Sequence, residues 1–427
     1  MNVEMLIALF GSLLFCLIIG LPIGYSLMMC SVSIILLFDL VSLSALPATL
    51  FNSLNSFSLT AIAFFILAGN LMDKGQLMQS IINITRNIFS KIRGGLGIAM
   101  MVTCSVFAAM CGTSVASAAA MGNMGIPMME KEGYPKSFSA AAIASGGTIG
   151  ILIPPSLSFI LIGNLISENI SDLFIAGILP GIIQTVILSL CVYAICKRKS
   201  YGRVGIKQKV NKQDVIKGLW ALLMPIIVLG GIYSGVFTPT EAAAVSVLYA
   251  LIVVVFVYKA VNWKTIKSVV LDSAKMTANL LVILAGASLF GLVLTYSRLP
   301  QQLVSIVETA NVPKWLFFVL MTFIMFILGC IMDGTTQTVI AVPILWPIAQ
   351  SFGINPLAFA VYVVATVELA TLTPPVGMNL FVVTGISKEP IGRVVKELVP
   401  FFIAQLVTIF IFAICPQVST FLVGLSK

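Results

Sequence analysis

The chain contains no histidine and few charged residues. Only 9% of its 427 residues are Asp, Glu, Lys or Arg. The absence of histidine removes the commonest proton shuttle and general base of enzymes. The eight cysteines occur singly, with no C-x-x-C pair, so we expect small buried apolar residues rather than a zinc site or a disulfide. The sequence also lacks the G-x-x-x-x-G-K-[ST] phosphate-binding motif of many ATPases.

Apolar residues make up most of the chain. They account for 59% of it and include several runs longer than 18 residues. Such runs predict membrane-spanning helices, so we interpret the chain as an all-α polytopic membrane protein rather than as soluble domains. The first run, Met5 to Ile19, follows no basic residues and has no small-residue cleavage site ahead of Pro22, so we expect a retained span, not a signal peptide.

Basic residues are distributed unevenly among the loops. The net charge of +9 would suggest nucleic acid as a partner of a soluble protein, but in a membrane protein the charge indicates orientation. Placing five segments on one side collects 21 of the 24 Lys and Arg residues there, and we expect that side to be cytoplasmic. The segments are Lys74 to Arg93, Lys131 to Lys136, Lys197 to Lys217, Lys259 to Lys275 and Lys388 to Lys396.

One unusual pattern occurs twice. A Gly/Ser/Thr tract inside apolar sequence, Cys111 to Ser117, is followed by a Pro-Pro break at Ile149 to Ser156, and the tract Asp333 to Thr338 is followed by a similar break at Glu368 to Val376. The spacing between copies stays at 220 to 222 residues, which predicts a duplicated unit. The matching pairs are Pro154 and Pro374, Gly133 and Gly353, Pro135 and Pro356, and Gly112 and Gly334.

The charges predict how each copy enters the membrane. Segment 96–129 has basic flanks, Arg93 and Lys131, so both ends lie on one side and it forms a re-entrant hairpin. Segment 315–349 lies between connectors of the other side and dips in from there. The two halves are therefore expected to be inverted-topology repeats, each with a hairpin and a discontinuous helix. The units are residues 1–196 with broken helix 138–165, the basic connector 197–218, and residues 219–427 with broken helix 356–385.

The interrupted helices suit an ion and an anion. Unwound backbone at membrane depth is tolerated only inside protein or beside a water-filled cavity. Helix ends leave carbonyls free and Ser or Thr adds oxygens for a hard cation, whereas N-termini of resumed helices attract a carboxylate. A role in helix packing or kinking is the alternative for either tract alone. Asp333 and Glu368 lie well inside apolar sequence, where carboxylates usually serve function, and Cys111 and Thr148 occupy the corresponding positions in the first copy.

Other segments predict local structure. Thr238-Pro-Thr-Glu241 fits a capping box that starts a helix. The stretches Asp73 to Arg93, Asn262 to Lys275 and Pro300 to Lys314 are amphipathic and too polar to span, so we expect arms at the membrane interface, with lipid recognition by their basic residues as the alternative. Residues 400–424 predict one last span.

Six short sequences along nearly the whole chain give it a family resemblance: Ala68 to Asp73, Cys111 to Ser117, Gly125 to Pro127, Gly150 to Ser156, Met332 to Thr335 and Thr373 to Asn379. With these, the chain resembles the large membrane subunit of tripartite ATP-independent periplasmic (TRAP) transporters, within the ion transporter superfamily. The resemblance implies an elevator-type transporter of a bacterial inner membrane. It also implies a small membrane subunit of about four helices, a periplasmic substrate-binding protein, and import of an organic acid driven by sodium without ATP.

The resemblance also implies residues for each site. Two sodium ions are expected, one at the first tip and break and one at the second, with the anion between the tips. The first sodium site would comprise Gly112, Thr113, Ser114, Ser117, Thr148, Gly150 and Pro154. The second would comprise Asp333, Gly334, Thr335, Thr336, Thr338, Glu368, Thr371 and Thr373. The substrate would contact Ser114, Pro155, Ser156, Thr336, Pro375 and Asn379.

Several alternatives remain open at this stage. Sialic acid is the first expectation for the substrate and a C4-dicarboxylate the second, although no quoted residue decides between them. Proton coupling through Glu368 is an alternative to sodium coupling. An ion channel or a scaffold within a membrane complex is a different class of function. An intramembrane hydrolase is not expected, because the chain lacks histidine and its two buried carboxylates lie in different breaks; we predict that it is not an enzyme.

Overall fold

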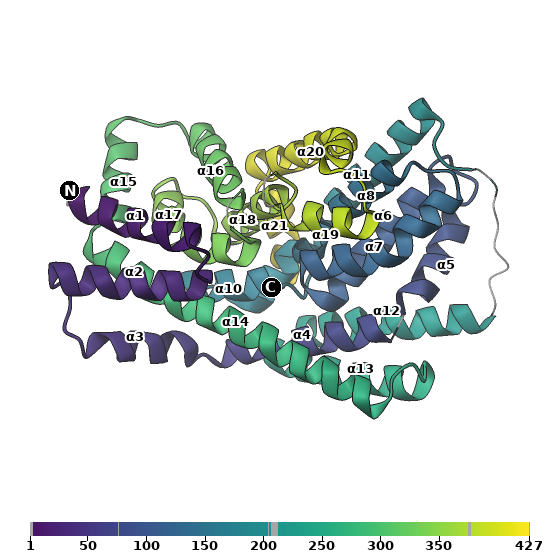
Figure 1. Ribbon diagram of the computed structural model, residues 1–427, viewed down its shortest axis with the longest axis horizontal. Coiled ribbons are helices and arrows are strands. Elements are labelled where there is room, and N and C mark those ends of the chain that lie inside the picture. Colours follow the sequence, from purple (N-terminus) through teal and green to yellow (C-terminus); the bar gives the residue numbers. More distant parts are fainter. Residues whose placement is uncertain are drawn as a thin grey trace.

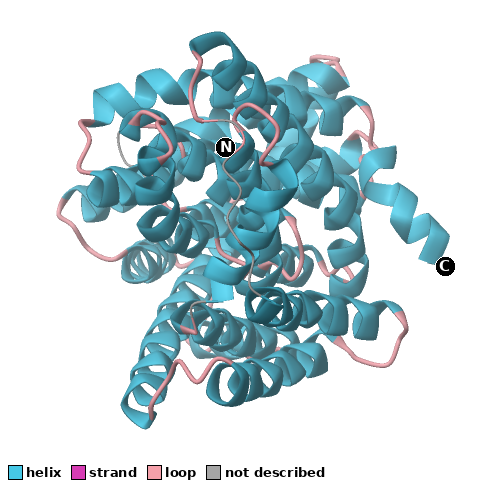
Figure 2. Ribbon diagram, turned by 90° about the vertical axis from the view of Figure 1, so that its right-hand side faces the viewer, coloured by secondary structure: helices cyan, strands magenta, loops and turns pink. Residues whose placement is uncertain are grey.

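The computed structural model describes residues 3–75, 77–203, 205, 212–330, 332–374 and 377–426. Within these residues the regular structure is helical, with loops between helices and no strand (Figure 2). The prediction of an all-helical chain is thus confirmed.

The helices of the first half precede the basic connector. They are α1 (Val3–Ile18), α2 (Ile23–Phe38), α3 (Ala45–Leu54), α4 (Phe57–Lys74), α5 (Leu77–Phe89), α6 (Gly95–Cys111), α7 (Ser114–Lys131), α8 (Lys136–Gly147), α9 (Ile149–Leu152), α10 (Leu157–Ile166) and α11 (Ile170–Lys199).

The helices of the second half start with α12, which begins at Lys212 inside the connector 197–218, and a π-helical turn, Val253–Val257, extends α13. They are α12 (Lys212–Tyr233), α13 (Pro239–Ile252), α14 (Trp263–Tyr296), α15 (Leu299–Thr309), α16 (Lys314–Gly329), α17 (Gly334–Ser351), α18 (Pro356–Ala370), α19 (Met378–Ser387), α20 (Ile391–Ile414) and α21 (Gln417–Ser426).

Six helices of the described chain are long and apolar enough to cross a membrane. They are α4, α11, α12, α13 with its π-helical turn, α14 and α20. Helices α8 and α9 with α10 form a seventh candidate, which is bent by 42° at a short break. Because each span needs about 20 apolar residues, this set confirms a polytopic membrane protein.

Helix α14, the longest of the described chain, belongs to a layer of helices along one side of the molecule. Helices α14, α4 and α13 follow the lower edge of Figure 1, with α2 and α3 beside them, and α14 packs against α2, α3 and α4. Small residues permit this packing, since a Cβ on Gly286 would lie 2.5 Å from the carbonyl oxygen of Gly24. Such close backbone approach between helices is typical of membrane interiors.

The remaining helices build a second body, above this layer in Figure 1. Helices α6, α7, α8 and α11 pack together, as do α16, α17, α18 and α20. The two groups also contact each other through α8 with α20, α11 with α18, and α7 with α19. This body contains every segment in which the sequence predicts an interrupted helix.

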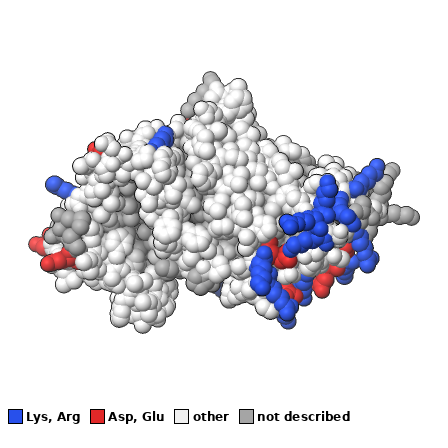
Figure 3. Space-filling view, turned by 90° about the horizontal axis from the view of Figure 1, so that it is seen from above, with Lys and Arg blue, Asp and Glu red and all other residues white. Residues whose placement is uncertain are grey.

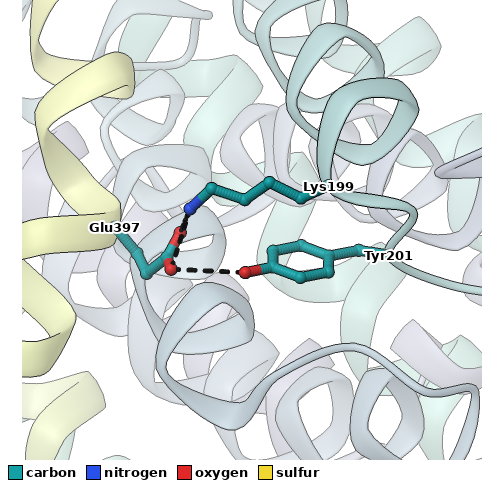
Figure 4. A network of polar contacts seen from close by, with 3 residues as sticks. All are labelled: Lys199, Tyr201 and Glu397. Carbon is teal, nitrogen blue, oxygen red and sulfur yellow. Dashed lines mark hydrogen bonds and ion pairs between the residues drawn. The ribbon is translucent and has the colours of Figure 1, made fainter.

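Basic side chains gather at one end of the long axis on the face drawn in Figure 3. The chain leaving α11 is joined to the second half: Lys199 pairs with Glu397 of α20 at 2.8 Å, and the Tyr201 hydroxyl donates to the same carboxylate (Figure 4). Arg86 of α5 pairs with Glu132 at the end of α7. Burial raises the pKa of the Glu132 carboxyl, and Arg86 opposes that shift.

Local predictions can be compared with these helices. The capping box is confirmed, because the Thr238 side chain accepts from the Glu241 amide and the Glu241 side chain from the Thr238 amide. The arm at Asn262 to Lys275 is not a separate element, since α14 continues from Trp263 to Tyr296. The single last span is wrong, because α20 ends before Cys415 and Pro416, and α21 begins a new helix. Helix α3 was not expected.

Candidate functional site

Four helix interruptions meet in the second body. Two of them are hairpin tips: Gly112 and Thr113 lie between α6 and α7, and residues 330–333 lie between α16 and α17. Two break apolar helices, at residues 153–156 before α10 and at residues 371–377 between α18 and α19. Contacts within each half and between the two halves hold these four interruptions in place.

The first hairpin tip lies against the first break. The Leu157 amide donates to the Gly112 carbonyl at 3.4 Å, and Gly112 has a φ of +64°, which favours glycine. A Cβ on Gly112 would lie 2.8 Å from the Pro155 carbonyl oxygen. A Cβ on Gly150 would lie 3.0 Å from the Ser117 hydroxyl and 3.1 Å from the Thr113 carbonyl oxygen. The tip and break therefore leave no room for larger residues.

The second hairpin tip contacts the second break in the same way. The Cys330 thiol donates to the Pro374 carbonyl at 3.3 Å. A Cβ on Gly334 would lie 2.7 Å from Cγ1 of Val367 in α18. The Asn379 amide nitrogen of the backbone donates to the Thr371 carbonyl across the break at 3.2 Å. Pro375 lies outside the described residues.

Side chains and helices of the two halves also contact each other. The Asn379 side chain, at the start of α19, donates to the Ser114 hydroxyl at the start of α7 and lies 3.5 Å from the Ala144 carbonyl oxygen. Helix α19 packs against α7, and α10 packs against α17. Each resumed half-helix thus packs on the other half's hairpin, which brings all four interruptions together.

The polar atoms of the first tip differ in whether they already have a hydrogen-bond partner. The Thr113 hydroxyl is buried without a hydrogen-bond partner, whereas Ser117 donates to the Thr113 carbonyl at 2.9 Å. Ser156 accepts from the Phe159 amide and caps α10. The free Thr113 oxygen is an available ligand for a cation.

Thr148 has its side chain fully engaged. Its hydroxyl donates to the Ser145 carbonyl at 2.6 Å and accepts from Gln184 of α11 at 3.1 Å and from Gln405 of α20 at 2.7 Å. A hydroxyl has one donor and two acceptor positions, so none remains for an ion. Sequence reasoning missed both glutamines. Their positions differ by 221, which matches the repeat spacing and could have revealed them.

Asp333 caps a helix. Its carboxylate accepts from the Thr335 and Thr336 amides at 3.0 and 3.3 Å, and from the Thr336 hydroxyl at 2.6 Å. A carboxylate at this position satisfies free amides of the first turn and favours the positive end of the helix dipole. Asp-x-x-Thr before an apolar helix is an N-cap pattern visible in the sequence.

The Glu368 carboxylate, unlike that of Asp333, forms no hydrogen bond within the described chain. Its side chain is 0% exposed, neither carboxylate oxygen has a hydrogen-bond partner, and Ser114 lies beside it without hydrogen-bond geometry. An ionised carboxylate in such surroundings is costly unless a cation or a proton neutralises it. The nearby hydroxyls are used locally, Thr371 on the Glu368 carbonyl, Thr373 on that of Leu369 and Thr338 on that of Gly334.

The structure therefore brings some of the predicted site residues together and not others. The structure brings Ser114 and Asn379 together and sets Thr113, Ser117 and Gly150 around one tip. In the described residues no group of three or more His, Cys, Asp or Glu residues could hold a metal ion. Any cation here would depend on hydroxyl and carbonyl oxygens, the ligands that sodium accepts in interrupted helices.

An all-helical membrane protein whose interrupted helices meet in its interior has the architecture of many secondary transporters. A family profile described as "Tripartite ATP-independent periplasmic transporter, DctM component" matches residues 10–418, and the chain belongs to this family. It is a transporter permease and not an enzyme, as the sequence predicts.

Relatives with different substrates in their names align along almost the whole chain. The C4-dicarboxylate TRAP transporter large permease protein DctM of Pseudomonas aeruginosa is 37% identical over 90% of each chain. The isethionate TRAP transporter permease protein DctMQ of Oleidesulfovibrio alaskensis is 32% identical over 99% of this chain and 67% of its own length. The sialic acid TRAP transporter large permease protein SiaM of Vibrio cholerae is 29% identical over 94% of this chain and 95% of its own.

A solved structure shares the fold. The crystal structure of the Alcanivorax borkumensis YdaH transporter superposes with a TM-score of 0.66 over 88% of this chain and 89% of its own, at 15% sequence identity.

Proposed function

We propose that this chain imports an organic acid anion with sodium ions by an elevator movement, as the permease of a bacterial inner-membrane TRAP system. The observation that carries the proposal is the contact of Asn379 with Ser114, because it joins the break of one half to the hairpin tip of the other. Ligands bound at this junction would contact both halves at once, as in transporters built from repeats.

The proposed architecture is a pair of inverted repeats, residues 1–196 and 219–427, joined by the connector 197–218. Each repeat contributes a hairpin (α6 with α7, α16 with α17) and a broken helix. The elevator would consist of these elements, moving against the layer that contains α2, α4, α13 and α14. The gathering of basic side chains at one end supports a cytoplasmic location for that end.

The proposed sodium ligands follow from what each side chain has left to offer. At the first tip, the free Thr113 hydroxyl and the carbonyl and hydroxyl groups of 112–117 and 150 would surround one ion. At the second, Glu368 would face the other ion together with the tip 334–338. Thr148 and Asp333 would position these elements through the bonds they already make, so their side chains would not bind sodium.

The proposed substrate is a small organic anion held between the tips by Ser114, Ser156, Thr336 and Asn379. No side chain caps the start of α19, so the positive end of this helix lies near this point and suits a carboxylate. A C4-dicarboxylate now precedes sialic acid as the expected substrate, since the relative named for C4-dicarboxylate is 37% identical and that named for sialic acid 29%.

The proposed partners are a periplasmic binding protein and a small membrane subunit. The family description is tripartite, and the aligned part of DctMQ leaves about a third of that protein for a further component. The bare carboxylate of Glu368 favours proton coupling as a second candidate, because a proton would neutralise it as well as sodium would.

Uptake of labelled succinate into proteoliposomes tests the proposal. The vesicles would contain the chain and its small membrane subunit, and the binding protein would be added outside. An inward sodium gradient should drive accumulation, and a pH gradient alone should not. Accumulation with a pH gradient and no sodium would establish the proton mechanism, whereas a steady current that needs no solute would establish a channel.

A further inference from the structure

A long apolar groove lies on the surface of the second body, away from the interruptions. It runs between α16, α18 and α20 and has a volume of about 560 Å³. Aromatic side chains form much of its wall, namely Phe318, Phe323, Phe326, Tyr362, Phe402 and Phe410. Pockets of about 300–1,000 Å³ are the size that holds one small ligand.

The polar groups in the wall satisfy one another. The hydroxyls of Thr322 and Tyr362 lie 2.6 Å apart, and the Phe318 carbonyl oxygen lies 2.9 and 2.8 Å from them, so one hydroxyl donates to the other and the second donates to the carbonyl. An apolar ligand would therefore leave no hydrogen bond unmade along this wall.

One end of the groove is charged. Lys314 and Trp315, at the start of α16, line it, and Trp315 is 65% exposed. Tryptophan with a neighbouring lysine is typical of headgroup depth in a bilayer. The other lining residues are uncharged, so Lys314 gives the groove a basic end and an apolar length.

An equivalent groove occurs in the first half, between α5, α6 and α11, with a volume of about 510 Å³. Six of its lining residues lie 220 positions before lining residues of the first groove. The pairs are Ile98 and Phe318, Val102 and Thr322, Val186 and Leu406, Ser189 and Ile409, Leu190 and Phe410, and Tyr193 and Ala413. It also has a basic group nearby, as the Lys197 amine lies 5.7 Å from the Tyr193 ring centre.

We propose that each groove binds one acyl chain of an anionic phospholipid, with the phosphate at Lys314 in one and at Lys197 in the other. Charge complementarity favours a phosphate at the basic end, and the apolar wall favours a hydrocarbon chain. A transmembrane helix about 10 Å across and about 30 Å long is much larger than either groove. The inference does not depend on the transported substrate. Only the placement of the two lipids in opposite leaflets rests on the proposed inverted repeats.

Tryptophan quenching by brominated lipid tests the groove at Lys314. A variant of the full chain with Trp220→Phe, Trp263→Phe and Trp346→Phe retains Trp315 alone and is placed in phosphatidylcholine nanodiscs. The matched control retains Trp263, which is 80% exposed and followed by Lys264 but lines no described groove. Brominated phosphatidylglycerol should half-quench Trp315 at a mole fraction about fivefold below that needed for Trp263, because both have a lysine beside them and only Trp315 lines a described groove; this ratio corresponds to about 1 kcal/mol.

Two further variants identify the cause. Ala413→Phe should fill the groove and bring the quenching of Trp315 to that of Trp263. Lys314→Gln should make brominated phosphatidylglycerol and phosphatidylcholine quench Trp315 equally. Equal half-quenching of Trp315 and Trp263 in the otherwise unchanged chain would overturn the proposal. So would loss of Trp315 quenching on addition of a tryptophan-free small membrane subunit, which would show that protein covers the groove.

Discussion

Asn379 and Ser114 form a hydrogen bond although 265 positions separate them in the sequence. Asn379 begins the resumed half-helix α19, and Ser114 begins the returning half-helix α7. Both are buried, with 0% and 1% of their surfaces exposed. Two helix N-termini from different halves are thus held side by side at the proposed substrate site.

Asn379→Ala should abolish uptake while leaving the chain folded. The change removes the donor to a buried hydroxyl, which costs about 1–3 kcal/mol, and deprives an anion of an amide. Asn379→Ser keeps a hydrogen-bonding group and should retain part of the uptake. Initial rates in proteoliposomes measure both. A normal rate with Asn379→Ala would remove this residue from the site.

Glu368→Gln should remove the dependence of transport on one cation. Glutamine has nearly the same shape but carries no charge, so a sodium ion or proton would lose its counter-charge. We expect initial uptake at least about tenfold lower, which corresponds to about 1.4 kcal/mol, and a changed sodium concentration for half-maximal rate. An unchanged sodium dependence would show that Glu368 does not face the ion.

Gly150→Ala should block transport by steric conflict at the first tip. The added Cβ would lie 3.0 Å from the Ser117 hydroxyl and 3.1 Å from the Thr113 carbonyl oxygen. The matched control is Gly385→Ala on α19, where nothing lies within 4 Å of the new carbon. Uptake should fall sharply for the first variant and stay normal for the second. Equal activity of both would mean that the tip tolerates displacement.

Gln405→Leu should destabilise the chain more than Gln184→Leu. Gln405 donates to Thr148 at 2.7 Å and Gln184 at 3.1 Å, and each loss leaves a buried acceptor with fewer partners. The expected cost is about 1–2 kcal/mol for Gln405→Leu. Thermal unfolding midpoints in detergent show which glutamine variant is less stable. Thr148→Val removes the shared acceptor, so its effect on stability should not add to that of either glutamine variant.

Removal of the ion pair between Lys199 and Glu397 should change stability little. The Lys199 side chain is 45% exposed and that of Glu397 17%, and ion pairs in contact with solvent contribute about 0.2–1 kcal/mol. A double-mutant cycle with Lys199→Ala and Glu397→Ala should give a coupling energy in that range. A coupling above about 2 kcal/mol would indicate that the pair is an essential join between the halves.

The sequence predicts the interruptions better than it predicts the roles of their side chains. Gly/Ser/Thr tracts and Pro-Pro pairs specify where helices stop, because backbone chemistry decides that locally. Whether a hydroxyl is free depends on distant neighbours. Gln184 and Gln405 donate to the Thr148 hydroxyl, whereas no group of the described chain forms a hydrogen bond with the Thr113 hydroxyl. Asp333 was interpreted by its charge alone, although its spacing to Thr336 also predicts a cap.

Errors in the helix boundaries have equally local causes. The polar residues of 262–275 suggested a separate arm, but α14 contains no Gly or Pro until Gly286, so nothing stops the helix between Trp263 and that point. At the other end, Pro416 follows Cys415 and interrupts what composition alone presents as one apolar run. Composition predicts depth in the membrane, and only specific residues end a helix.

The contact of Lys199 with Glu397 has a consequence for biosynthesis. These residues lie 198 positions apart, and a ribosome adding about 5–20 residues each second needs about 10–40 s to make the intervening chain. During that time the end of α11 waits without the partner shown in Figure 4. The end of α11 is therefore made before α20 and α21, which both pack against that helix, exist.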